Sequence, residues 1–203
     1  NAGKFAQYLF GAVNRLPMAL AVPSLFSLYR QPPLLKDALV IGVSQSGRSP
    51  DIISVMEEAG RQGAMSLAVT NSPVSPLADA SQFVLDICCG PERAVAATKS
   101  YTSSLVALAL LSAALADDED MRRSLELVPG WIEEMLAQEE VIARQAKFYR
   151  GMDRCVLLGR GYNYSTVYEW SLKLKELAGV MAEPFSSADF LHGPIAMVAA
   201  LKQ

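Results

Sequence analysis

The stretch VIGVSQSGRSPDIISVMEEAG, residues 40–60, decides the fold that the sequence predicts. Its first residues belong to the run ALVIGV at 38–43, and a continuous apolar run with β-branched members is typical of a parallel strand covered on both faces. From Asp51 to Gln62 the apolar residues recur at helical spacing, and Gly63 is a residue type that commonly ends a helix. The stretch therefore predicts a strand, a polar loop and a helix in succession.

The same alternation continues along the chain. Further elements are expected as strands at 64–70 and 83–87, a short helix at 76–80 and a long helix at 98–116. The acidic run at 117–120 then opens an amphipathic segment, 120–148, which predicts helical structure with a break near Pro129-Gly130. A strand at 154–158, a glycine-containing loop at 159–165 and a helix at 166–180 repeat the first pattern.

This alternation predicts an α/β fold with two doubly wound parallel sheets. We expect a first domain at 1–116, a helical linker at 117–150 and a second, incomplete domain at 151–203. The sequence starts at Asn1 without an initiator methionine, so we interpret it as a segment of a longer polypeptide.

Composition disfavours several classes of protein. Of the 203 residues, 51% are hydrophobic and the formal net charge is −3, so we expect a packed core rather than disorder. No basic run exceeds two residues, which gives little support for a nucleic-acid partner. The uncharged stretch 100–116 reaches the lower limit for a membrane span, but its four serines favour a buried helix, and no membrane partner is expected.

The cysteines are Cys88, Cys89 and Cys155. An odd number with one adjacent pair is no disulfide framework, and no His or Cys stands at the spacing of a zinc site. We therefore expect no metal, no cofactor and a reducing, cytoplasmic environment.

The polar loop at 44–50 lies where ligands bind in open parallel sheets, between the end of a strand and the start of a helix. Its hydrogen-bonding side chains are those of Ser44, Gln45, Ser46 and Ser49. Gly47 permits a tight turn, and free N–H groups at a helix start attract phosphate. The loop lacks the lysine of a Walker loop and the G-x-G-x-x-G spacing, so it predicts a neutral phosphate cradle. The alternative is an ordinary helix cap formed by Ser49, with Asp51 nearby.

Three motifs follow one another along the chain: SQSGRSPD at 44–51, GPERAVAATKSYT at 90–102 and LKLKELAGVMAEPFSSADFLHGP at 172–194. In order and spacing they resemble the sugar isomerase (SIS) family, most closely the isomerase half of glutamine–fructose-6-phosphate aminotransferase and the isomerase-type glucosamine-6-phosphate deaminases. The family usually has an acidic residue where this sequence has Arg48, whose role stays open between a phosphate contact and a solvent-facing side chain.

The resemblance implies a role for each matched position. Ser44, Gln45, Ser46 and Ser49 would hold the sugar phosphate and the neighbouring hydroxyls, and Val95 and Ala97 would line the sugar through their backbone. Glu176 would move a proton between C1 and C2, and Lys173 would position the open-chain sugar. His192 would open the pyranose ring, reaching across the interface of a homodimer.

The chemistry of the residues agrees with these roles. A carboxylate can take and return a proton, and Lys173, three residues before Glu176 on the same helix face, would keep it ionised. His192 is the only histidine, and an imidazole that titrates near neutral pH suits ring opening. The alternatives are a surface Lys/Glu helix face and a structural histidine.

We expect an enzyme that converts glucosamine 6-phosphate into fructose 6-phosphate and ammonia. Two alternatives remain open, a phosphosugar-binding regulatory module without catalysis and a fructosamine-phosphate deglycase. The expected partners are a phosphorylated sugar or amino sugar and a second copy of the chain, because the apolar faces at 100–116 and 125–136 exceed what two small sheets need.

Overall fold

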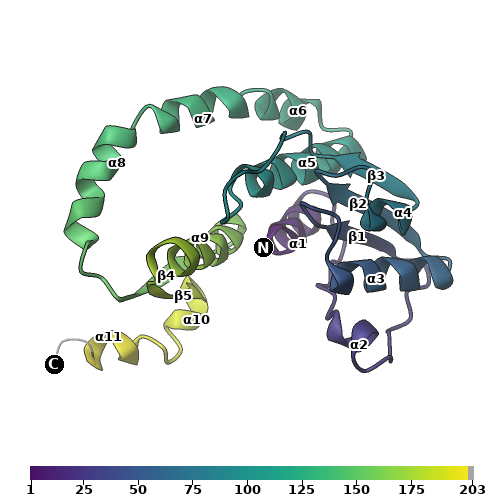
Figure 1. The fold of residues 1–203 in the computed structure, drawn as a ribbon, viewed down its shortest axis with the longest axis horizontal. Coiled ribbons are helices and arrows are strands. Elements are labelled where there is room, and N and C mark those ends of the chain that lie inside the picture. Colours follow the sequence, from purple (N-terminus) through teal and green to yellow (C-terminus); the bar gives the residue numbers. More distant parts are fainter. Residues whose placement is uncertain (201–203) are drawn as a thin grey trace. The chain divides into compact units, whose positions relative to one another are not determined.

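A computed structural model describes residues 1–200 (Figure 1). Its contacts divide the chain into two compact units. The serine-loop unit, named after the polar loop at 44–49, consists of Leu16–Leu111. The C-terminal unit combines Gly3–Arg15 with the chain from Ser112 onward. Each unit contains one parallel sheet.

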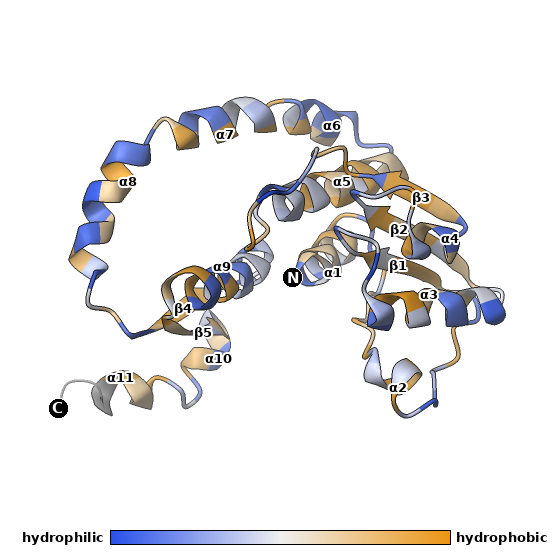
Figure 2. Cartoon of the chain, viewed as in Figure 1, coloured by the Kyte–Doolittle hydropathy of each residue, from blue (hydrophilic) through white to orange (hydrophobic). Residues whose placement is uncertain are grey.

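The serine-loop unit is built on a three-stranded parallel sheet in the order β1 (Leu39–Val43), β2 (Met65–Thr70), β3 (Phe83–Asp86). Its helices are α2 (Ser24–Ser27), α3 (Pro50–Arg61), α4 (Pro76–Asp79) and most of α5 (Lys99–Ala116). Apolar residues concentrate in the strands, whereas α3 carries both apolar and polar segments (Figure 2). The buried core of Met56, Ala68 and Leu77 joins α3, β2 and α4, so α3 is fixed on the sheet at the end of the loop that precedes it.

The C-terminal unit is a β–α–β crossover, in which α9 (Tyr162–Ala178) connects the parallel strands β4 (Arg154–Gly159) and β5 (Met181–Ser186). Helix α1 (Ala2–Ala12) contacts α9 through aromatic pairs, such as Phe5 and Tyr162 with ring centroids 5.9 Å apart. The short helices α10 (Ser187–Phe190) and α11 (Ala196–Ala200) follow β5. Before β4 the chain forms α6 (Glu119–Leu125), α7 (Val128–Leu136), α8 (Glu139–Ala146) and a 3₁₀ turn at Lys147–Tyr149.

Most elements predicted from the sequence are confirmed, and parallel strand pairing agrees with the predicted α/β class. The predicted loop at 159–165 is wrong, because α9 begins at Tyr162. The cause is Gly159: a Cβ there would lie 2.5 Å from the Asn163 carbonyl oxygen, so its absence lets the first turn of the helix pack directly on the strand. Strand β5 and helices α1 and α2 were not predicted.

The polar segment after α5 breaks twice rather than once. Pro129 lies in the first turn of α7, so the predicted break precedes it, and Gly130 is inside the helix. The second break falls between α7 and α8, at Ala137 and Gln138. None of α6, α7 and α8 contains a buried residue.

Helix α5 alone, within residues 1–200, has the length and the hydropathy of a membrane span. Four of its residues at intervals of four, Ser100, Ser104, Leu108 and Ser112, are buried in the protein. Burial of this serine-bearing face agrees with the prediction of a helix packed inside the fold. The cysteines Cys88, Cys89 and Cys155 are free thiols.

Candidate functional site

The serine loop, residues 44–49, connects β1 to α3. The Ser44 N–H donates to the Val69 carbonyl at 3.0 Å, which extends the sheet ladder into the loop, and the Gly47 N–H donates to the Ser44 carbonyl at 3.3 Å, which closes a turn. Gly47 is buried with φ +62°, and a Cβ there would overlap the side chain of Ser75. Only glycine therefore fits this turn without displacing its neighbours.

The carbonyl of Gln45 is held from the neighbouring strand β2. It accepts from the Thr70 hydroxyl at 3.3 Å and from the Asn71 N–H at 3.1 Å. Because a trans peptide directs its N–H opposite to its C=O, these bonds turn the Ser46 N–H away from the end of β2. The end of β2 thus fixes the orientation of the peptide at the centre of the loop.

Ser49 occupies the position before α3 but does not cap it. The structure gives Ser49 no side-chain capping bond, with Pro50 taking the first helical position, which argues against the alternative of an ordinary serine cap. Ser46 is exposed, and its oxygen accepts from the Arg48 N–H at 3.3 Å, which leaves its own hydroxyl proton to donate. Arg48 is exposed, and the ion pairs of the described residues do not include it.

A second loop, Cys89–Thr98, carries Val95 and Ala97 in the same unit. Val95 is fully exposed and Ala97 is half-buried. The start of the loop is held by the side chain of Asn71, which accepts from the Cys89 N–H at 3.0 Å and donates to the Gly90 carbonyl at 2.8 Å. Asn71 therefore contacts both the serine loop and this second loop.

The end of the second loop is held by Glu92. Its carboxylate accepts from the N–H of Ser100 at 3.0 Å, from the Ser100 hydroxyl at 2.9 Å and from the Thr98 N–H at 3.2 Å. These hydrogen bonds lower the pKa of the Glu92 carboxyl, and the one from the Ser100 N–H has the largest effect. Sequence reasoning missed Asn71 and Glu92. The one available signal was that Asn71 is the first residue after its strand, as Ser44 is the first residue after the neighbouring strand.

Lys173 on α9 lies between two carboxylates. Its ammonium is 2.9 Å from Glu176 and 3.3 Å from Glu169, which confirms the predicted Lys173–Glu176 pair. Partial burial lowers the pKa of Lys173, but the hydrogen bonds to Glu176 and Glu169 outweigh it and the pKa is raised. Sequence reasoning missed Glu169, although its position four residues before Lys173 places both on one helix face.

His192 lies apart from Glu176 within the C-terminal unit. Glu176 is in the last turn of α9, next to the start of β5, whereas His192 follows the end of β5 in an exposed turn. Glu176 lies fourteen positions after Tyr162, at the opposite end of α9, which is about 20 Å along the helix axis. The unit therefore does not bring Glu176 and His192 together.

The backbone of the turn that carries His192 is held by a hydrogen bond and by an aromatic contact. The His192 N–H donates to the Asp189 carbonyl at 3.0 Å, and buried Phe190 contacts Phe185 with ring centroids 5.6 Å apart. This packing fixes the backbone of the turn and leaves the imidazole exposed.

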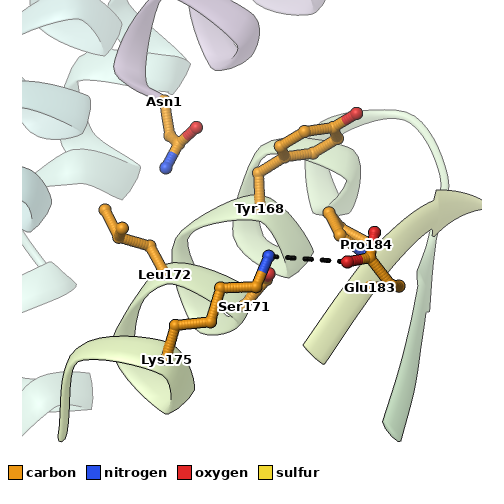
Figure 3. Close-up of a pocket in the computed structure, with 7 residues that line it drawn as sticks. All are labelled: Asn1, Tyr168, Ser171, Leu172, Lys175, Glu183 and Pro184. Carbon is orange, nitrogen blue, oxygen red and sulfur yellow. Dashed lines mark ion pairs between the residues drawn. The ribbon is translucent and has the colours of Figure 1, made fainter. Parts of the chain in front are cut away.

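A cavity of about 410 Å³ lies on the same unit, against α9 and β5. Figure 3 shows its lining, with the Lys175–Glu183 pair at 3.8 Å across it. The lining residues are Asn1, Tyr168, Ser171, Leu172, Lys175, Glu183 and Pro184. None of the site residues predicted from the sequence lines this cavity, and in the part of the chain that the structure describes no three His, Cys, Asp or Glu side chains form a metal-binding group.

The predicted residues thus fall into two sets. Ser44, Gln45, Ser46 and Ser49 lie with Val95 and Ala97 in the serine-loop unit, and Lys173, Glu176 and His192 lie in the C-terminal unit. The first set lies beyond the carboxyl ends of parallel strands, the usual location of ligand sites in such folds, and in the second set His192 follows the carboxyl end of β5 whereas Glu176 lies near its amino end.

Known proteins resemble the chain over almost its whole length. Glutamine–fructose-6-phosphate aminotransferase (isomerizing) of Thermus thermophilus is 36% identical over 206 residues, and the match covers 97% of this chain and 34% of that protein. The chain therefore spans about a third of this curated relative.

Solved structures share the fold. The C-terminal domain of glucosamine-fructose-6-phosphate aminotransferase from Francisella tularensis matches with a TM-score of 0.90 and 28% identity, over 97% of this chain and 58% of that one. Glucosamine-6-phosphate deaminase from Thermotoga maritima matches with a TM-score of 0.83 over 96% of this chain and 60% of that one, and at 22% identity this is a likeness of fold alone.

The SIS domain model matches residues 2–114, which is more than half of the chain. The serine loop and the loop that carries Val95 and Ala97 both lie inside this match. The chain belongs to the SIS domain family.

Proposed function

We propose that the chain is the phosphosugar-handling part of an enzyme that converts glucosamine 6-phosphate into fructose 6-phosphate and ammonia. The observation that carries the proposal is the ion pair of Glu176 with Lys173 at 2.9 Å, because it holds a carboxylate in a fixed orientation beside an ammonium on one face of α9. Relatives named for aminotransfer to fructose 6-phosphate support the amino sugar as substrate.

The residues take successive roles in this reaction. The hydroxyls of the serine loop and the N–H groups at the start of α3 bind the phosphate, with Val95 and Ala97 against the sugar. His192 opens the pyranose ring by moving a proton between the ring oxygen and the C1 hydroxyl. Lys173 positions the open-chain sugar.

Glu176 then takes the proton from C2 of the open-chain aldehyde while O1 gains a proton, which gives an enolamine. Return of the proton to C1, with loss of a proton from nitrogen to the group that protonated O1, leaves a C2 imine. Water adds to that imine and ammonia leaves, so C2 ends as the ketone of fructose 6-phosphate. Hydroxyls and backbone N–H groups can stabilise the developing charge, and the proposal requires no metal or cofactor.

The proposed enzyme is a cytoplasmic homodimer without nucleic-acid or membrane partners. Because Glu176 and His192 lie at opposite ends of one unit, we infer that His192 of the partner subunit completes the site. The proposed domains stay those expected from the sequence, a first SIS domain at 1–116, a helical linker at 117–150 and a second domain at 151–203.

Ammonia release from glucosamine 6-phosphate by the full-length protein tests the proposal. Turnover of this substrate supports it. Turnover of a fructosamine phosphate alone would move the assignment to a deglycase, which uses related enolamine chemistry. Binding of phosphosugars without any turnover would identify a regulatory module, which needs the serine loop but no acid–base pair.

A further inference from the structure

Asn71 joins three loops at the carboxyl ends of three adjacent strands. It follows β2 directly, and its backbone N–H donates to the Gln45 carbonyl of the serine loop at 3.1 Å. Its side-chain amide both accepts from the Cys89 N–H at 3.0 Å and donates to the Gly90 carbonyl at 2.8 Å. Asn71 therefore contacts the loop after β1 through its backbone and the loop after β3 through its side chain.

The segment that Asn71 holds is also fixed at its far end. Three hydrogen bonds to the Glu92 carboxylate tie this loop to the first turn of α5. Val95 and Ala97 lie between the two attachment points, on a stretch without regular secondary structure. The position of this stretch is set by the two attachments rather than by a sheet or helix of its own.

We propose that Asn71 is a positioning residue that sets the distance between the serine loop and the loop Cys89–Thr98. This rests on the proposed function, in which the first loop binds the phosphate and the second contacts the sugar. The distance between the loops then has to match the distance from the phosphate to the reacting carbons. Asn71 acts on the substrate through Gln45, Cys89 and Gly90 rather than by contact.

The physical reason for an effect on catalysis is geometric. A misplacement of about 1 Å at a reacting group can lower a rate about 100-fold, although each hydrogen bond that prevents it is weak on its own. Asn71→Ala deletes both side-chain bonds and keeps the backbone bond to Gln45. The serine loop should then keep its conformation while the second loop moves.

Binding of two probes separates these effects. For Asn71→Ala we expect the affinity for inorganic phosphate to change less than about twofold, the affinity for fructose 6-phosphate to fall about tenfold, and kcat on glucosamine 6-phosphate to fall further. Thr70→Val is the matched control, because it deletes the hydroxyl that donates to the Gln45 carbonyl and accepts from the Ser72 N–H, and it should weaken the binding of both ligands alike. Equal loss of both ligands in Asn71→Ala, or no loss of either, would overturn the proposal.

Reactivity of the Cys89 thiol tests the attachment without any substrate. Burial raises the pKa of this thiol, so it should react slowly with an aromatic disulfide reagent in a Cys88→Ser, Cys155→Ser background. We expect Asn71→Ala, or the milder Asn71→Ser if the alanine variant fails to fold, to accelerate the reaction several-fold. An unchanged reaction rate would show that the Asn71 side chain does not hold the second loop, which would overturn the proposal. A wild-type protein that neither binds nor converts phosphosugars would overturn only the proposed function.

Discussion

At the scale of single residues, Gly47 decides whether the serine loop can form. It combines φ +62° with a position where a Cβ would overlap Ser75, so both the backbone conformation and the space exclude other residues. Its carbonyl also accepts from the Leu77 N–H at 3.0 Å, which ties the turn to the start of α4. The loop is therefore held in one conformation before any ligand binds.

Gly47→Ala should destabilise the protein. The left-handed backbone alone costs about 1–2 kcal/mol for a residue with a Cβ, and displacement of Ser75 adds to it. Urea unfolding measures the loss. Gly60→Ala is the control, since Gly60 lies in α3 with no atom within 4 Å of the added Cβ, and it should leave stability unchanged or raise it by up to about 1 kcal/mol. Equal stability of the two variants would show that the turn tolerates a side chain.

The residues that the sequence revealed are those whose chemistry is local. The serines and Gln45 stand together in one loop, and Lys173 and Glu176 are one helical turn apart, so composition and spacing were sufficient. Asn71 and Glu92 act through contacts with segments six or more residues away, and a side chain of either type also suits an ordinary surface turn. No local sequence pattern distinguishes an Asn or Glu that holds a distant loop from one in an ordinary surface turn.

At the scale of elements, strands without an apolar run were the hardest to predict. Strand β5 contains Glu183 and Pro184, and proline is depleted in strands except at edges. It forms because α9, ended by Gly179 in the left-handed conformation, returns the chain beside β4, where Leu157 pairs with Pro184. This pairing is a long-range contact that single-sequence periodicity does not contain.

The loop Cys89–Thr98 should be sensitive to acid. The pKa of Glu92 is below its ordinary value of 4.5, so the folded protein favours the charged carboxylate. The stabilisation is present above pH 4.5 and is lost as the pH falls through the lowered pKa. Glu92→Gln should reduce stability at pH 7, and the difference from the wild type should disappear in acid.

Urea midpoints of both proteins from pH 7 down to pH 3 would measure this difference. Glu134→Gln, an exposed carboxylate on α7, is the control and should follow the wild-type curve. A constant gap between Glu92→Gln and the wild type at every pH would mean that the charge of Glu92 contributes nothing.

At the scale of the whole molecule, the proposed homodimer would account for the separation of Glu176 from His192, because each active site would take one of these residues from each subunit. The exposed apolar face of α7 offers a surface for the proposed dimer, because Trp131, Met135 and Leu136 are between 52% and 69% exposed. If His192 of the partner subunit completes each site, mixing inactive Glu176→Gln with inactive His192→Ala should restore activity, since some heterodimers hold one intact site.

The mixed subunits must exchange, which fluorescence energy transfer between labelled copies can verify. Random pairing of equal amounts would then restore up to about a quarter of the wild-type sites. Verified exchange without any recovered activity would assign both residues to the same subunit, or remove His192 from catalysis.

The most direct test of the account compares binding with turnover in one variant. Glu176→Gln keeps the size of the side chain and removes the carboxylate that is proposed to move the proton between C2 and C1. The full-length variant should bind fructose 6-phosphate with an affinity within a few-fold of the wild type and release no ammonia from glucosamine 6-phosphate. Parallel loss of binding and turnover would make Glu176 a structural residue, and turnover near the wild-type rate would contradict its role as the acid–base group.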